Sequence, residues 1–203
     1  MKFSEVRRLA ASIGTGIAAL QSPGSPVAVF MEKSVLMAVS LLGVSYGGCS
    51  YCPVDVAMPE ARMDRILSVL EPAAVLTSGS MGARAREACG DCPVLLVEDL
   101  AARPADEALL ASLRARIKSS DPLYILFTSG STGMPKGVVG THQTVLNNLE
   151  WLASRFDLGP DDVLGNQAPL HFVVADHDLY CPLKFGCSSF FIPAGYFSFP
   201  AKL

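Results

Sequence analysis

The sequence contains little charge, and none of it is gathered into a block. Of 203 residues, 16 are Lys or Arg and 19 are Asp or Glu, which gives a formal net charge of −3. Like charges form no long run anywhere in the chain. Because such a chain has no strong positive field, we expect no nucleic acid and no anionic membrane among its partners.

We also expect no secretory leader and no membrane span. Residues Met1–Arg8 carry charges where a signal peptide needs an apolar stretch, so we expect a cytoplasmic protein. One stretch of 21 residues, Ser34–Val54, is free of charge. It contains three glycines and Pro53, which favour a helix, a turn and a buried strand over a membrane helix.

Hydrophobic residues, in contrast, make up 50% of the chain, which is enough to fill a sizeable core. Short, unbroken apolar runs alternate with stretches of helical periodicity, such as 4–20, 34–46 and 62–70. The runs predicted to be strands are Val27–Phe30, Cys49–Val54, Ala73–Leu76, Val94–Val97 and Leu123–Phe127. This pattern is typical of an α/β fold with layered, mostly parallel sheets flanked by helices.

Four of the six cysteines form two C-x-x-C pairs, Cys49/Cys52 and Cys89/Cys92. A zinc ribbon usually separates its pairs by about 15–20 residues of compact loop. Here 36 residues intervene, and they have the pattern of strand, helix, strand and helix. Neither pair opens a helix after a strand, as a redox motif would. We therefore predict no metal site, and a zinc-stabilised binding module stays as an alternative.

The segment Thr128–Gly137 has an unusual composition: four hydroxyl side chains, three glycines and one lysine. Glycines let backbone N–H groups turn toward an anion, hydroxyls donate further hydrogen bonds, and Lys136 adds a positive charge. The segment therefore suits a polyphosphate, although an ordinary surface turn has a similar composition. It does not fit the P-loop pattern GxxxxGK[ST], because Pro135 stands five residues after Gly130 and Gly137 follows the lysine.

In full, Tyr124–Val139 resembles the signature phosphate-binding loop of the adenylate-forming (AMP-binding) superfamily, most closely that of nonribosomal peptide synthetase adenylation domains. Three further segments match in the expected order. Phe3–Ala10 is similar to the first core motif, Leu41–Arg62 to the second, and Phe172–Gly186 to the segment that opens the acyl-substrate pocket. The resemblance spans nearly the whole chain and implies the N-terminal portion of the large domain of such an enzyme.

The resemblance implies a reaction in two steps. The carboxylate of a carboxylic or amino acid attacks the α-phosphorus of ATP, held with Mg²⁺, and gives an acyl-adenylate and pyrophosphate. A thiol, either the phosphopantetheine arm of a carrier protein or coenzyme A, then displaces AMP. In this scheme Lys136 is the catalytic residue that offsets the charge of the departing pyrophosphate. The residues implied to hold the phosphates are Thr128, Ser129, Gly130, Ser131, Thr132, Gly133, Lys136 and Gly137.

The resemblance also implies a substrate pocket, formed by His171, Phe172, Val173, Val174, Asp176 and His177. Val173 stands where amino-acid-activating relatives carry an aspartate that pairs with the α-ammonium group. We therefore expect an acid without an α-amino group, with Asp176 as the alternative partner for an ammonium. His171 could gate the pocket or simply pack. Outside the pocket, we expect His142 to pack or cap a helix and Trp151 to lie in the core.

We expect one partial adenylation domain over residues 1–203, in which 1–120 form a first α/β subdomain and 121–203 supply the phosphate-binding loop and the start of the acyl pocket. The sequence contains no match to the family's adenine motif, ribose-binding aspartate, hinge or C-terminal catalytic lysine. The expected partners are therefore the missing C-terminal part of the domain and a carrier-protein domain. We expect the chain alone to be inactive, and a non-catalytic remnant is the alternative. Phe199–Leu203 has the pattern of a helix that is just beginning.

Overall fold

The computed structural model describes residues 1–129, 134–193 and 196, and the chain divides into two units, Met1–His142 and Gln143–Leu203. The first unit is built on a sheet that has six strands among the described residues. These are β1 (Pro26–Phe30), β2 (Ser50–Val54), β3 (Ala74–Thr77), β4 (Val94–Leu96), β5 (Pro122–Thr128) and β6 (Lys136–Thr141). Its helices are α1 (Phe3–Leu20), α2 (Val35–Tyr46), α3 (Glu60–Leu70), the 3-10 helix η1 (Gly79–Met81), α4 (Gly82–Cys89), α5 (Val97–Ala101) and α6 (Glu107–Arg114).

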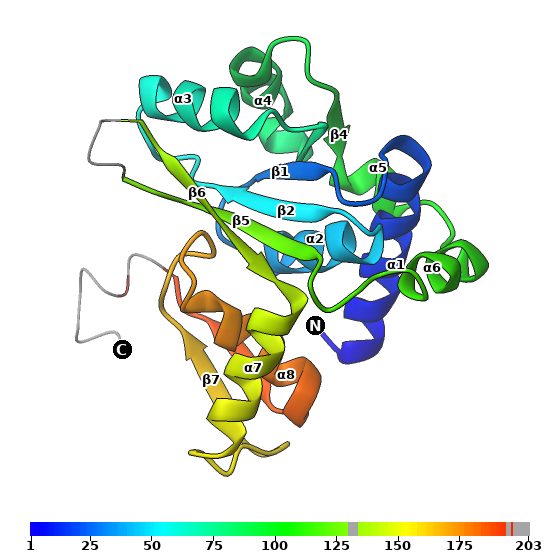
Figure 1. Cartoon of the computed structure of the whole chain (residues 1–203), viewed down its shortest axis with the longest axis vertical. Coiled ribbons are helices and arrows are strands. Elements are labelled where there is room, and N and C mark those ends of the chain that lie inside the picture. The colour runs from blue at the N-terminus through cyan, green and yellow to red at the C-terminus, as the bar shows by residue number, and fades with distance from the viewer. Residues whose placement is uncertain (130–133, 194–195, 197–203) are drawn as a thin grey trace. The chain divides into compact units, whose positions relative to one another are not determined.

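The strand order is β4-β3-β1-β2-β5-β6, and every neighbouring pair is parallel except β5 and β6. The chain moves from β1 to β2 in one direction and then crosses back over β1 to reach β3. Because such crossovers are right-handed, α2 and α3 must cover opposite faces of the sheet. Figure 1 shows this arrangement, with α3 and α4 on one side and α1 and α2 on the other. The predicted α/β class is confirmed.

The strands at the centre of this sheet are buried along nearly their whole length. In β1, residues Val27–Val29 are 0% exposed, and in β3 Ala74–Thr77 are 0% exposed as well. A strand that alternated between a covered and a solvated face would show alternating exposure, whereas a strand between two helical layers does not. The unbroken apolar runs of the sequence therefore correspond to strands that are covered on both faces.

Helices α1 and α2 approach each other closely because glycines stand at their crossing. A Cβ atom on Gly43 would lie 2.5 Å from Ile13 Cγ2, and one on Gly14 would lie 2.6 Å from Tyr46 Cβ. Both separations are shorter than any ordinary contact between carbon atoms, which is about 3.5–4.0 Å. Any larger residue at either position would push the two helices apart.

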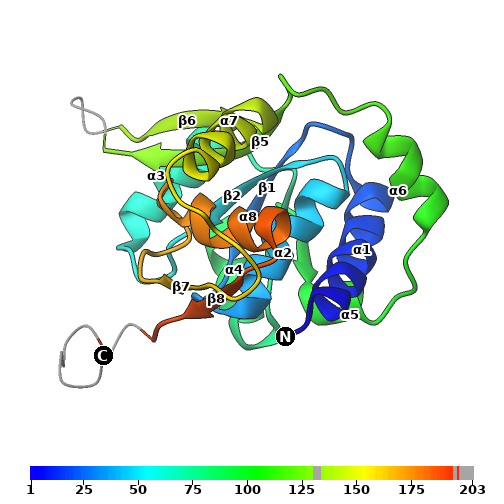
Figure 2. The ribbon, with the colours of Figure 1, turned by 90° about the horizontal axis from the view of Figure 1, so that it is seen from below.

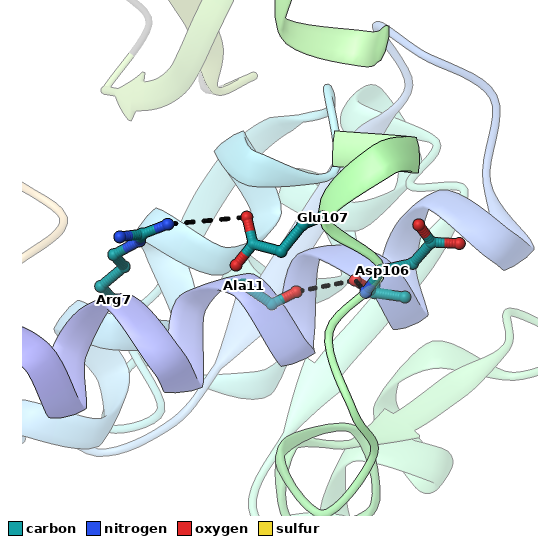
Figure 3. Close-up of polar contacts among 5 residues, drawn as sticks. Arg7, Ala11, Asp106 and Glu107 are labelled. Carbon is teal, nitrogen blue, oxygen red and sulfur yellow. Dashed lines mark hydrogen bonds and ion pairs between the residues drawn. The ribbon is translucent and has the colours of Figure 1, made fainter. Parts of the chain in front are cut away.

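The hydroxyl group of Thr15 connects α1 to the start of α6 by two hydrogen bonds (Figure 3). Thr15 donates to the carbonyl of Ala11 at 2.9 Å and accepts from the backbone N–H of Asp106 at 2.9 Å. Asp106 in turn caps α6, because its carboxylate accepts from the N–H of Leu109. Arg7 and Glu107 add an ion pair at 3.7 Å, but both side chains are largely exposed and the pair contributes little. Figure 2 shows α1, α5 and α6 grouped together.

The second unit contains a parallel pair of strands joined by a helix. Its elements are α7 (His142–Ala153, whose first residue belongs to the first unit), β7 (Val163–Asn166), α8 (Ala175–Phe185) and β8 (Ser188–Phe191). Strands β7 and β8 pair in parallel, so α8 is the crossover helix of a β-α-β unit. The expected helix at Phe199–Leu203 lies outside the described residues.

The structure places Trp151 outside the core. Trp151 is 56% exposed, so the prediction that it lies in the core is wrong. The buried residues of α7 are Val145, Leu149 and Leu152, spaced four and three apart, and Trp151 falls about 100° away from this stripe. Strands β5 and β6 belong to the sheet of the first unit, so the compact unit ends at His142. The functional division at residues 120 and 121 stays a prediction.

Among the described residues, no helix has both the length and the apolar character that crossing a membrane requires.

Candidate functional site

The candidate loop joins the only two antiparallel neighbours of the described sheet, β5 and β6. Strand β5 runs parallel to β2, β1, β3 and β4, so its carboxyl end lies at the same edge of the sheet as theirs. In open α/β sheets, ligands bind outside the carboxyl ends of the strands. The loop after Thr128 therefore lies at the edge where a ligand is expected.

The register of the hairpin sets Thr128 directly opposite Lys136. Residues directly opposite each other on an antiparallel pair extend to the same face of the sheet, with Cβ atoms about 4.5–5.5 Å apart. Both residues are exposed, as are Ser129 and Gly137. The other four predicted loop residues, Gly130, Ser131, Thr132 and Gly133, lie outside the described residues.

These described residues fit a polyphosphate by the chemistry of their donors. Thr128 and Ser129 offer hydroxyl groups, and Lys136 offers an ammonium group on the same face as Thr128. The segment Thr128–Gly137 contains no acidic side chain that would repel an anion. A magnesium ion would reach this site bound to the phosphates, as part of the substrate.

A close packing contact fixes the position of the hairpin further along β6. Gly140 pairs with Tyr124, and a Cβ atom on Gly140 would lie 2.0–2.6 Å from carbon atoms of the Tyr124 ring. The ring therefore covers the backbone of Gly140. Tyr124 is only 3% exposed, and its ring centroid is 6.0 Å from that of Tyr51 on β2. Sequence analysis did not single out Gly140, because the need for glycine arises from the residue on the neighbouring strand.

In the second unit, the predicted pocket residues lie at and before the start of α8. Phe172, Val173 and Val174 are 52–55% exposed, whereas Asp176 is 7% exposed. The His171 and Phe172 rings are in contact, with centroids 4.8 Å apart. The N–H of Asp176 donates to the carbonyl of Val173 at 3.1 Å, so the turn is already helical there. Val173 thus lies at the surface, whereas Asp176, the alternative partner for an ammonium group, is buried and His177 is partly buried.

Three polar residues that sequence analysis did not assign a role attach α8 to its two strands. Asn166, at the end of β7, is fully buried and donates to Asp178 Oδ2 at 2.7 Å. Pro182 inside α8 has no N–H to donate to the carbonyl of Asp178, and the hydroxyl of Ser189 on β8 donates to that carbonyl instead. The sequence does contain one sign of the Ser189 contact. Pro182 lies inside a helical pattern, and a proline there leaves the carbonyl four residues earlier in need of another hydrogen-bond donor.

His142 lies at the amino edge of the sheet, away from the hairpin tip. The backbone N–H of His142 donates to the carbonyl of Asp121, the residue just before β5, at 3.2 Å. Burial lowers the pKa of His142, and the nearby Asp121 carboxylate partly opposes this shift. His142 also lines a cavity of about 280 Å³ with Pro23, Gly24, Gly48, Leu113, Arg116, Ile117, Asp121 and Pro122. This position agrees with packing at the start of α7.

The complete chain, residues 1–203, matches the family described as AMP-binding enzyme. The chain belongs to the AMP-binding enzyme family. The resemblance stated on the loop and the three other segments is therefore confirmed.

Relatives of this AMP-binding chain include nonribosomal peptide synthetases and a carrier-protein ligase. Vanchrobactin synthetase VabF of Vibrio anguillarum is 31% identical over 178 residues, which cover 84% of this chain and 6% of the relative. An L-proline–[L-prolyl-carrier protein] ligase of Streptomyces coelicolor is 30% identical over 190 residues, which cover 84% of this chain and 35% of the ligase. The chain thus spans about a third or less of these curated relatives.

Among solved structures, the nonribosomal peptide synthetase FmoA3 with bound α-methyl-L-serine-AMP superimposes with a TM-score of 0.80 at 28% identity. The match covers 93% of this AMP-binding chain and 20% of FmoA3. It agrees with the predicted fold, the N-terminal portion of a larger enzyme domain.

The zinc-module alternative receives no support from the cysteines. Within the described part of the chain, which includes all six of them, no three His, Cys, Asp or Glu side chains are grouped as metal ligands. Cys52 is 1% exposed in the core, where burial raises its pKa to about 12. A thiol in that environment behaves as a small apolar side chain.

Proposed function

We propose that this AMP-binding chain supplies the phosphate-binding loop and the beginning of the acid pocket to an enzyme that activates a carboxylic or amino acid with ATP. The product is an acyl-adenylate, which a thiol then attacks. The observation that carries the proposal is the position of Thr128 opposite Lys136 at the carboxyl edge of the sheet. Hydrogen-bond donors and a positive charge gather there without any carboxylate in the same segment.

In the first step, a carboxylate oxygen of the acid attacks the α-phosphorus of ATP, and the bond to the bridging oxygen of pyrophosphate breaks. Negative charge then grows on the leaving group. Thr128 and Ser129 would hold the β- and γ-phosphates by hydrogen bonds, together with the four loop residues outside the described set. Lys136 would offset the charge of the leaving pyrophosphate. Fixed donors and charges of this kind lower the barrier because they need no reorganisation during the reaction.

In the second step, a thiol sulfur attacks the acyl carbonyl and AMP leaves with the bonding electrons. The thiol belongs to a carrier protein's phosphopantetheine arm or to coenzyme A. The named carrier-protein ligase relative supports the carrier protein as acceptor. The segment His171–His177 would form the entrance of the acid pocket, and its exposed valines favour an acid without an α-amino group.

Binding of pyrophosphate and of ATP with Mg²⁺ to the chain tests the proposed loop directly. Lys136→Ala should weaken both by at least tenfold, which corresponds to about 1.4 kcal/mol. Lys118→Ala is the matched control: it removes the same charge from an exposed position three residues before Asp121, at the amino edge of the sheet. Equal affinity of the wild type and Lys136→Ala would assign Lys136 to an ordinary surface turn.

The same substitution tests the chemical step in the protein that carries this chain. Lys136→Ala should lower the rate of acid-dependent ATP–pyrophosphate exchange by about 10²–10³, the usual effect of removing one preorganised group. The KM for the acid should change less, because the ammonium group faces the leaving pyrophosphate and not the acid. A protein that binds pyrophosphate through Lys136 but shows no exchange would correspond to the non-catalytic remnant.

A further inference from the structure

One of the two C-x-x-C pairs lies in a tight turn, outside the candidate site. Cys89 is the last residue of α4, and the N–H of Cys92 donates to the carbonyl of Cys89 at 3.1 Å. This bond closes a four-residue turn, in which the first and fourth Cα atoms are less than about 7 Å apart. Disulfides span Cα separations of about 4.4–6.8 Å. The backbone therefore already holds Cys89 and Cys92 at a separation that a disulfide can bridge.

Both cysteines also face the same opening. They line a cavity of about 350 Å³ together with Asp64, Leu67, Ser68, Pro72 and Ala88. Each residue is only partly buried, which leaves the pair open to a small reagent on the side of the cavity, and the Cys92 thiol donates to the carbonyl of Pro72 at 3.2 Å. Burial and, to a smaller extent, the charge of a nearby Cys92 thiolate together raise the pKa of the Cys89 thiol to about 11, as expected for neighbouring sulfur atoms.

The other pair has the same spacing but the opposite geometry. From Cys49 the chain enters β2, so Cys49 and Cys52 are separated by extended backbone. Three residue steps at about 3.3 Å each place their Cα atoms about 10 Å apart, which is too far for a disulfide. The Cys49 thiol donates to the carbonyl of Ser22, whereas Cys52 is buried in the core and lies beside Ala28 on β1. Cys49 and Cys52 therefore serve as an internal control, because they have the same spacing without the turn that brings Cys89 and Cys92 together.

We propose that Cys89 and Cys92 form a reversible intramolecular disulfide by exchange with a low-molecular-weight disulfide such as oxidised glutathione. One thiolate attacks a sulfur of the reagent, forms a mixed disulfide and releases one reduced thiol. The second cysteine then attacks its partner's sulfur in the mixed disulfide and releases the other thiol. The protein loses two electrons and two protons, and the reagent is reduced to two thiols.

The position of the pair distinguishes this site from a redox catalyst. Catalytic C-x-x-C pairs lie at helix N-termini, where the positive end of the helix dipole stabilises a thiolate. Cys89 lies at the C-terminal end of α4, where the negative end of the helix dipole disfavours the thiolate. The expected disulfide therefore forms slowly and joins the end of α4 to the turn that leads through Pro93 into β4. Figure 1 shows α4 and β4 side by side.

Peptide mass spectrometry on the folded 203-residue chain tests the proposal. The chain is incubated with oxidised glutathione, unfolded, alkylated and cleaved with trypsin, which separates the pairs into Glu87–Arg114 and Ser34–Arg62, because trypsin does not cleave between Arg103 and Pro104. Glu87–Arg114 should lose its two alkylation sites and about 2 Da of mass, whereas Ser34–Arg62 should carry two alkyl groups. Of the six cysteines, four should remain as thiols.

Single substitutions provide the matched comparison. Cys92→Ser and Cys89→Ser should each leave a glutathione adduct on the remaining cysteine of Glu87–Arg114, because no second thiol resolves it. Cys49→Ala should leave the loss of about 2 Da unchanged. The proposal is overturned if Glu87–Arg114 of the wild type stays fully alkylated, if it retains a glutathione adduct, or if Ser34–Arg62 is oxidised to the same extent.

Discussion

Replacing Gly140 with alanine introduces a single methyl group beneath the Tyr124 ring. The new Cβ atom would lie 2.0 Å from Cζ of the ring, whereas an ordinary carbon contact is about 3.5 Å. Either the ring or strand β6 must therefore move by about 1.5 Å. The ring cannot turn into solvent freely, because Tyr124 is 3% exposed and lies near Tyr51.

The cost follows from two opposing effects. Alanine in place of a strand glycine gains about 0.5–1 kcal/mol from lower chain entropy in the unfolded state. Overpacking in a closed environment costs about 1–3 kcal/mol. We therefore expect Gly140→Ala to lower the free energy of unfolding by about 1–2 kcal/mol. Gly137→Ala is the control. Its Cβ would lie 3.2 Å from Ile125 Cγ2, which is a much milder contact, so this substitution should leave the free energy of unfolding nearly unchanged.

Urea unfolding followed by far-ultraviolet circular dichroism measures these differences. With a slope of about 2 kcal/mol per M, the expected loss shifts the midpoint by about 0.5–1 M. A double-mutant cycle with Tyr124→Ala isolates the contact, because Gly140→Ala should cost nothing once the ring is absent. The reasoning is refuted if Gly140→Ala is as stable as Gly137→Ala, or if its cost is the same with and without the Tyr124 ring.

Three further outcomes are expected. The 203-residue chain alone should show no acid-dependent ATP–pyrophosphate exchange with a broad mixture of acids, since it spans 35% of the ligase relative; turnover of about 1 per second would contradict this. Gly43→Ala should destabilise the fold by about 1–2 kcal/mol in urea unfolding, because its Cβ would lie 2.5 Å from Ile13 Cγ2 and this clash outweighs the helix propensity of alanine. In the protein that carries this chain, matched α-hydroxy or α-keto acids should exceed α-amino acids in exchange rate because Val173 cannot pair with an ammonium group; a tenfold preference for amino acids would make Asp176 the residue to mutate.

Sequence periodicity located the central elements of the first unit to within about a residue. Strand β1 begins at Pro26, one residue before the predicted start, and Ser34 caps α2 by accepting from the N–H of Met37 at 3.1 Å. Such elements are predictable because a continuously buried strand and a helix cap both depend on residues that are neighbours in the sequence. Trp151 was misplaced because the stripe that α7 buries is narrower than the apolar pattern of its sequence.

The candidate site could be predicted only in part. Composition identified the hydroxyl groups and Lys136, since they are adjacent in the sequence. The pairing of Thr128 with Lys136 depends on the register of two strands, and composition carries no information about register. The burial of Asn166 and its bond to Asp178 depend on the packing of α8 against β7, which a single sequence does not reveal. The phosphate-binding role of all eight loop residues stays a prediction.

The glycine beneath the Tyr124 ring has a consequence for insertions and deletions. If β6 slipped by one residue, Val139 or Thr141 would lie under the ring, and every side chain of β6 would exchange faces. Lys136 would then extend to the face opposite Thr128. Losing one residue between Lys136 and Gly140 should therefore be far more damaging than substituting Val138 or Val139, which are about half exposed. The contact between Tyr124 and Gly140 thus fixes the number of residues between the ring and the loop, and so keeps Lys136 opposite Thr128 on the same face of the sheet.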